Sequence, residues 1–304
     1  MINNFKGIGV DLVTPFHKDG NIDFKAFETL INHTIENNCH YIVVHGSVSE
    51  REALSKDERN AVLDFVIDTV DKRVPIVAGI SANNTQKFVN MRESFTNGID
   101  AVITVVPYFV QPSQKGIYIH FKTIANVCPY PIIILNAPEQ TGVNIEPETV
   151  QMLYEEVENI IGLCNISGNY IKTMQIIKNT SKGRDFLVLC GNDLQILPLM
   201  SAGAGGAISP LSNAYSKLLT GFYYEFINNN LDKAREMYFE LFDVIKLAYQ
   251  EGVISGVKVI LERMNLIENN LRLPLVKMNK IHYKLLNDQM DIFEKKLIKS
   301  KTII

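Results

Sequence analysis

Short runs of apolar residues alternate with longer amphipathic segments along most of the chain. The runs are rich in valine and isoleucine and stay apolar at successive positions, which is typical of parallel strands buried on both faces. Each is short enough to be a strand and not a helix. The sequence predicts eight such strands, at Ile8–Val13, Tyr41–His45, Val74–Gly79, Ala101–Val106, Pro131–Leu135, Ile160–Cys164, Phe186–Cys190 and Gly206–Ser209.

The segments between the predicted strands have the apolar spacing of helices. Asp23–Asn37 brings several apolar side chains onto one helix face, namely Phe24, Phe27, Leu30, Ile31 and Ile35. Ser55 and Glu58 have the spacing of a capping box, so a second helix is expected to begin after Ser55. Eight strand–helix units joined by short connections predict an α/β fold, a (β/α)8 TIM barrel, and 304 residues is a typical length for it.

Three further amphipathic segments follow the last predicted strand–helix unit. Leu231–Tyr249, Ser255–Asn265 and Val276–Lys299 are all predicted to be helices. No stretch rich in glycine or proline suggests a linker before about residue 230. We therefore expect a barrel over residues 1–229 and a C-terminal helical extension over 230–304 that packs on the barrel.

Composition and charge exclude several classes of function. The net charge of -3 gives no electrostatic footprint for nucleic acid or for an anionic membrane. No apolar run approaches the roughly 20 residues that span a bilayer, and Met1–Gly7 is too short and polar for a signal peptide. Cys39, Cys128, Cys164 and Cys190 lie far apart, which indicates reduced thiols. We expect a cytoplasmic protein with no metal and no cofactor.

Motifs at the ends of the predicted strands resemble those of a known family. They are Val13-Thr-Pro-Phe16, Asp19-Gly-Asn-Ile-Asp23, Gly46 with Glu50, Pro112-Ser-Gln-Lys-Gly116, Thr141-Gly-Val143 and Leu271-Arg-Leu-Pro-Leu275. With these motifs the chain resembles the dihydrodipicolinate synthase / N-acetylneuraminate lyase family of pyruvate-handling class I aldolases, from Gly7 to about Met278. The loop Gln111–Tyr118 and the Arg-Leu-Pro-Leu stretch favour the dihydrodipicolinate synthase branch.

The resemblance implies a reaction that depends on a lysine. In the family, a lysine amine on the sixth strand attacks the carbonyl of pyruvate, and the resulting iminium acts as an electron sink. The matching position in this sequence is Cys164. A thiol can add to a carbonyl but cannot give the cationic imine. The resemblance therefore predicts a family member that has lost lysine-imine catalysis.

Other positions that the resemblance assigns to catalysis also differ. Of the family's three-hydroxyl relay only a hydroxyl at Ser47 remains, because Leu135 and Phe109 stand where tyrosines are expected. Val48 replaces a threonine that helps to hold the pyruvate carboxylate. Gln140 replaces an arginine near the mouth and cannot give the bidentate, charge-assisted recognition of a carboxylate. These losses together indicate a scaffold kept for another use.

The resemblance also implies a ligand site and an assembly. We expect a small oxo acid or related metabolite to bind at the barrel mouth. The expected lining residues are Ser47, Val48, Gln140, Leu135, Ile208 and Asn192. The family's assemblies imply a homodimer or homotetramer, with Tyr108 and Phe109 at the interface.

Asp11, His45 and Cys164 form a candidate replacement site. Asp11 lies on the first strand, and His45 stands two residues before Ser47, hence on the same side of the second strand. We expect Asp11 to hydrogen-bond to His45 and Cys164 to open into the same cavity. A Cys/His/Asp group with Ser47 nearby can support acyl transfer or addition. Alternatively, Asp11 and His45 are a buried polar pair and Cys164 is a small buried hydrophobe.

Three hypotheses about function follow. The chain is a binding or regulatory protein without lysine-imine catalysis, or it is an enzyme with altered chemistry that uses Asp11, His45 and Cys164. The third hypothesis is a working lyase of the family, which requires that Cys164 does not match the lysine position. The sequence leaves all three open.

Overall fold

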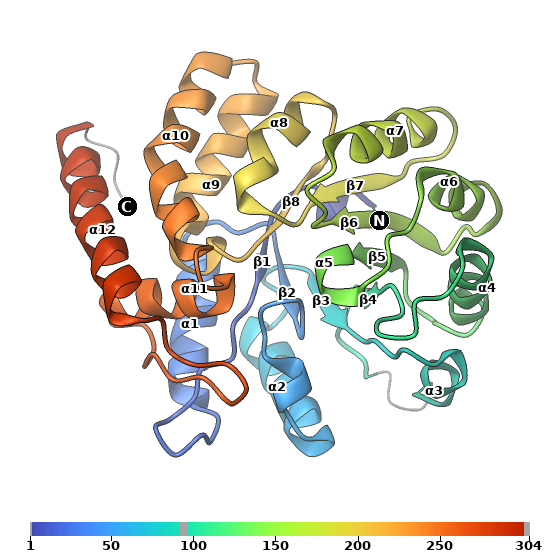
Figure 1. The fold of residues 1–304 in the computed structure, drawn as a ribbon, viewed down its shortest axis with the longest axis horizontal. Coiled ribbons are helices and arrows are strands. Elements are labelled where there is room, and N and C mark those ends of the chain that lie inside the picture. The colour runs from blue at the N-terminus through green and yellow to red at the C-terminus, as the bar shows by residue number, and fades with distance from the viewer. Residues whose placement is uncertain (1, 92–95, 301–304) are drawn as a thin grey trace. The chain divides into compact units, whose positions relative to one another are not determined.

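Eight parallel strands form a closed barrel in the order of the chain (Figure 1). The structure, a computed structural model, describes residues 2–91 and 96–300. The strands are β1 (Gly7–Asp11), β2 (Tyr41–Val44), β3 (Ile76–Gly79), β4 (Ala101–Val105), β5 (Ile132–Asn136), β6 (Ile160–Asn165), β7 (Leu187–Cys190) and β8 (Gly206–Ser209). All eight lie close to their predicted bounds. The predicted (β/α)8 TIM barrel is confirmed.

One 3-10 helix precedes the first strand, and further helices and short 3-10 helices follow the strands. They are η1 (Ile2–Phe5), α1 (Phe24–Glu36), η2 (Arg51–Ala53), α2 (Lys56–Val70), α3 (Thr85–Asn90), α4 (Gln114–Ala125), α5 (Pro138–Thr141), α6 (Pro147–Glu156), α7 (Tyr170–Thr180), η4 (Asp193–Gln195), α8 (Ile196–Ser201), α9 (Ser212–Ile227), α10 (Leu231–Ala248), α11 (Val253–Arg263) and α12 (Lys280–Ser300). The capping box predicted at Ser55 and Glu58 begins α2, so that helix starts where the sequence indicates.

The chain forms two compact units. We call residues 1–6 and 75–208 the central unit, and residues 7–74 and 209–304 the terminal unit. In the central unit, β3 to β7 pair in parallel register, with Leu135 beside Cys164 and Cys164 beside Leu189. The division into barrel and extension at residue 229 stays a prediction.

In the terminal unit, β1 pairs with β2 and packs against α9. Helix α10 packs on α9, and α12 lies beside α10 (Figure 1). Helix α12 begins at Lys280, later than the predicted Val276, because the side chain of Asn279 accepts hydrogen bonds from the N–H groups of Ile281 and His282. That contact is an N-cap, and it fixes the start of the helix.

Among the helices in the described part of the chain, none is both long and apolar enough to span a membrane.

Candidate functional site

The loop that follows β2, residues 45–50, lies at the carboxyl end of a barrel strand, where TIM-barrel enzymes carry their sites. Hydrogen bonds within the terminal unit fix this loop. The Thr14 hydroxyl donates to the Ser49 carbonyl at 2.6 Å, and the Ser49 hydroxyl donates to the Gly46 carbonyl at 2.9 Å. Both oxygen pairs are within ordinary hydrogen-bond distance, so the loop has a defined shape.

Asp11, the last residue of β1, is bonded to this loop through Ser47. Its Oδ2 accepts hydrogen bonds from the Ser47 N–H at 3.0 Å and from the Ser47 hydroxyl at 2.6 Å. The Asp11 side chain is buried, with 2% of the residue exposed. Asn213 holds the strand itself, because its Nδ2 donates to the Asp11 carbonyl at 2.6 Å and its Oδ1 accepts from the Val13 N–H at 3.2 Å.

The predicted hydrogen bond between Asp11 and His45 is wrong. His45 Nε2 donates to the Arg59 carbonyl of α2 at 2.8 Å, and His45 Nδ1 is buried without a hydrogen-bond partner. The reason is the backbone: β2 ends at Val44, and His45 has a φ of 58°, so the alternation of side chains along the strand no longer applies to it. Burial lowers the pKa of His45 to about 4, so its imidazole is neutral near pH 7.

A buried ion pair closes the far end of the loop. Lys258 of α11 donates to Glu50 Oε1 at 2.5 Å, to the Thr14 carbonyl at 2.8 Å and to the Asn270 carbonyl at 2.7 Å. The side chains of Lys258 and Glu50 are 0% and 1% exposed. Burial lowers the pKa of Lys258, and the Glu50 carboxylate opposes this. This pair was not predicted, although a lysine within the apolar stretch Val257–Leu261 is a signal for a buried, paired amine.

Arg272, in the Arg-Leu-Pro-Leu motif, extends this network. Its backbone N–H donates to Glu50 Oε2 at 2.9 Å. Its guanidinium donates to both carboxylate oxygens of Glu58, at 2.9 and 2.5 Å, and lies 4.6 Å from the centre of the Phe16 ring. The Arg272 hydrogen bonds hold the pKa of Glu58 down at about 2. The motif therefore ties the segment after α11 to the loop after β2 and to the start of α2.

Cys164 lies on β6 in the central unit, between Leu135 of β5 and Leu189 of β7. It is 1% exposed, and its neighbourhood is tight, since a Cβ added to Gly191 would come within 2.9 Å of its Sγ. Leu135 and Ile208, both predicted to line the ligand site, are buried as well. Cys164, Leu135 and Ile208 are therefore buried strand residues, and none of them is exposed at the surface.

Two asparagines at the ends of β5 and β6 form an amide network that the sequence analysis missed. Asn136 Nδ2 donates to Asn165 Oδ1 and to Asn144 Oδ1, both at 2.8 Å. Asn165 Nδ2 donates to the Thr173 hydroxyl at 2.7 Å. Asn136 and Asn165 are each 1% exposed. This network is neutral, so it orients the ends of two strands but supplies no acid or base.

The remaining predicted site residues differ in accessibility. Val48 is buried, whereas Gln140 is exposed on α5. The side-chain oxygen of Asn192 accepts from the Leu194 N–H at 3.0 Å, so it caps η4. Tyr108 is half-buried, and Phe109 is 90% exposed. The roles predicted for these residues stay predictions.

The family model for the dihydrodipicolinate synthetase family matches residues 4–292. The chain belongs to this family. A 4-hydroxy-tetrahydrodipicolinate synthase of Flavobacterium psychrophilum is 37% identical over 296 residues, which cover 97% of this chain and 99% of the relative. One of Cytophaga hutchinsonii is 39% identical over 277 residues, covering 91% of this chain and 92% of the relative.

Solved structures of dihydrodipicolinate synthases have the same fold. The 4-hydroxy-tetrahydrodipicolinate synthase of Methylacidiphilum fumariolicum matches with a TM-score of 0.93 and 30% identity, covering 98% of each chain. A monomeric dihydrodipicolinate synthase variant matches with a TM-score of 0.92 and 31% identity, covering 96% of this chain and 98% of the variant. The likeness to the dihydrodipicolinate synthetase family therefore covers nearly the whole barrel.

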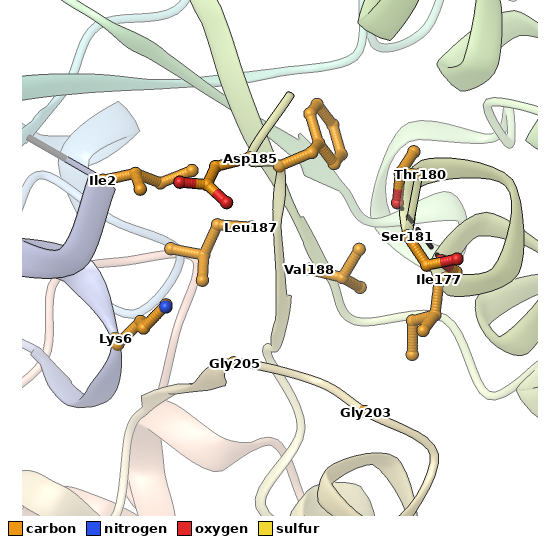
Figure 2. Close-up of a pocket in the computed structure, with 11 residues that line it drawn as sticks. Ile2, Lys6, Ile177, Thr180, Ser181, Asp185, Leu187, Val188, Gly203 and Gly205 are labelled. Carbon is orange, nitrogen blue, oxygen red and sulfur yellow. Dashed lines mark hydrogen bonds between the residues drawn. The ribbon is translucent and has the colours of Figure 1, made fainter. Parts of the chain in front are cut away.

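Two cavities of this family member lie away from the carboxyl ends of the strands. Figure 2 shows one in the central unit, with a volume of about 180 Å³, where Lys6 and Asp185 lie near Leu187. Leu187 begins β7 and Gly205 precedes β8, so this cavity is at the amino ends of the strands. The other, of about 500 Å³, lies in the terminal unit and is lined by side chains of α1, α9, α10 and α12. Within residues 2–91 and 96–300, no three His, Cys, Asp or Glu side chains are placed to hold a metal ion.

Proposed function

We propose that this member of the dihydrodipicolinate synthetase family binds a small metabolite at its barrel mouth without forming a lysine imine. The observation that carries the proposal is β6, whose sequence Ile-Ile-Gly-Leu-Cys-Asn contains no lysine. Its buried Cys164 stands between Leu135 and Leu189. A thiol that adds to a ketone gives a neutral tetrahedral adduct, which cannot act as the cationic electron sink of an imine.

Two other lysines, one buried and one partly exposed, do not offer a substitute amine. Lys258 is the one among them that is buried, and its three N–H groups all donate to acceptors. An amine in this state has no free lone pair with which to attack a carbonyl. Lys172, early in α7, is partly exposed and paired with Glu146 at 2.7 Å. Imine formation needs an amine that is both unpaired and desolvated, and neither Lys258 nor Lys172 is in that state.

Synthase activity is the second candidate, and the names of the relatives favour it. The similar proteins of F. psychrophilum and C. hutchinsonii are named 4-hydroxy-tetrahydrodipicolinate synthases, and they align with nearly all of this chain. This candidate needs an imine-forming amine that does not lie on β6. An enzyme based on Asp11, His45 and Cys164 has less support, because His45 bonds to the Arg59 carbonyl and not to Asp11.

A side-by-side turnover assay distinguishes the two candidates. The purified chain and the F. psychrophilum synthase are given pyruvate and the same aldehyde acceptor, and pyruvate consumption is followed. We expect turnover from the relative and none from this chain. Cys164→Lys alone should stay inactive, because Leu135, Phe109 and Gln140 are unchanged, and Cys164→Ser is its matched control. Turnover by the unmodified chain would establish the second candidate and refute the first.

We also propose a homodimer or homotetramer with Phe109 at the interface. Phe109 is 90% exposed and the adjacent Val110 is 57% exposed. The backbone of Phe109 is left-handed, with a φ of 70°, and its N–H bonds to the Thr141 carbonyl at 3.2 Å. A large apolar side chain held outward on a strained backbone is typical of a contact surface.

A further inference from the structure

Two donors of Ser47 converge on a single point at the carboxyl end of β2. The backbone N–H and the hydroxyl lie 3.0 Å and 2.6 Å from the same oxygen, Asp11 Oδ2. A backbone N–H and a hydroxyl that meet on one oxygen are a binding arrangement for an anion, and the carboxyl ends of barrel strands are where ligands bind. In this chain the oxygen at that point belongs to the side chain of Asp11.

Contacts from β2, Asn213 and Gly46 hold the Asp11 carboxyl group in place beside the two Ser47 donors. Its strand is in register with β2, with Asp11 beside Val43, and Asn213 holds its backbone carbonyl at 2.6 Å. A Cβ added to Gly46 would lie 2.0 Å from Asp11 Oδ1, and the three atoms nearest to that Cβ all belong to the Asp11 carboxyl group. The carboxylate therefore packs directly on the backbone of Gly46, and this glycine makes the close approach possible.

The loop has little freedom to present Ser47 to another anion. Thr14 holds it through the Ser49 carbonyl, and Lys258 holds it through Glu50. On the other side of Ser47, His45 is fixed to the Arg59 carbonyl. Since both flanks of Ser47 are anchored, a ligand carboxylate could reach its donors only by displacing Asp11.

We propose that Asp11 is a built-in carboxylate that occupies the anion position of this loop and excludes ligands that would place their own carboxylate there. The inference rests on the proposed function and names the ligand class of the site. Two carboxyl groups cannot occupy one pair of donors at the same time, because the Ser47 N–H and hydroxyl both point at a single oxygen position. Small 2-oxo acids such as pyruvate are thereby disfavoured, and neutral or cationic metabolites are favoured. This replaces the oxo-acid ligand expected from the sequence.

Removal and replacement of the side chain test the inference. Asp11→Gly deletes a group that differs from acetate by one hydrogen, so acetate should refill the position. We expect acetate to raise the melting temperature of Asp11→Gly in a saturable way, with acetamide and sodium chloride at equal ionic strength as controls. Acetate should not raise the melting temperature of the wild type in this way, nor that of the double variant Asp11→Gly/Ser47→Ala. An acetate effect equal to that of chloride, or one that survives Ser47→Ala, would overturn the inference.

Two further measurements keep the test decisive if Asp11→Gly does not fold. Asp11→Ala retains the Cβ and should respond to formate in the same way. On the wild type, saturation-transfer NMR should detect no binding of pyruvate or acetate that depends on Ser47; such binding, lost in Ser47→Ala, contradicts the inference. An imine formed by the wild type would refute the proposed function and leave the acetate result unaffected, so the two failures are distinguishable.

Discussion

Lys258→Met breaks the ion pair that closes the loop after β2, and its cost follows from the contacts. The substitution keeps the length of the side chain but takes the Lys258 donor away from the Glu50 carboxylate, which is 1% exposed and still accepts from the Arg272 N–H. Removing one partner of a buried pair costs about 3–5 kcal/mol. The carbonyls of Thr14 and Asn270 also lose their donor, which costs about 1–3 kcal/mol each. The lower ends of these ranges sum to about 5 kcal/mol, so we expect the free energy of unfolding to fall by at least about that much.

Urea unfolding at pH 7 measures this loss, with Lys233→Met as the matched control. Lys233 forms an exposed ion pair with Glu236 on α10, at 49% and 58% exposure, so its substitution should cost less than about 1 kcal/mol. Lys258→Met/Glu50→Gln should cost clearly less than the sum of the two single variants, because the double variant buries no lone charge. Equal costs for Lys258→Met and Lys233→Met would refute the argument, as would strict additivity in the cycle.

The remaining predictions concern pH, packing and assembly. The pKa of His45 is lowered to about 4 in the fold, below its ordinary value of about 6.5, so the unfolded chain takes up the proton first and stability falls as pH drops from 6.5 toward 4. Asparagine tolerates the left-handed backbone at this position, so His45→Asn is the test. Its free energy of unfolding, measured by urea titration at pH 7 and pH 4.5, should differ less between the two pH values than that of the wild type. An equal difference in the two proteins would contradict the prediction. A Cβ at position 46 would clash with the Asp11 carboxyl group, so Gly46→Ala should lower the melting temperature more in the wild type than in the Asp11→Gly background. An equal drop in the two backgrounds would show that the Asp11 carboxyl group is not what the Cβ meets. Light scattering should find at least a dimer that Phe109→Ser weakens, and a wild-type monomer at micromolar concentration would contradict the proposed interface.

The fold could be predicted from the sequence because its signals are local. Buried parallel strands appear as continuous apolar runs, and the capping box at Ser55 fixes the start of α2 through residues three positions apart. Cys164, Leu135 and Ile208 were placed on strands correctly for the same reason.

The contacts of the site could not be predicted, because they depend on single backbone angles and on distant partners. His45 was assigned by strand alternation, but a φ of 58° just after β2 turns its side chain toward α2. The Glu50–Lys258 pair joins residues 208 positions apart, and no local pattern connects them. Asp11 was expected to bond to His45, yet its partner is Ser47, whose backbone N–H and hydroxyl both donate to it.

Borohydride trapping with pyruvate tests most directly whether the chain forms a lysine imine. The protein is incubated with pyruvate and sodium borohydride, and its intact mass is measured beside that of the F. psychrophilum synthase as a positive control. The account predicts an unchanged mass for this chain, because β6 carries Cys164 and the buried Lys258 is fully hydrogen-bonded. A stable reduced pyruvate adduct, mapped to any lysine of the wild-type chain, would contradict it.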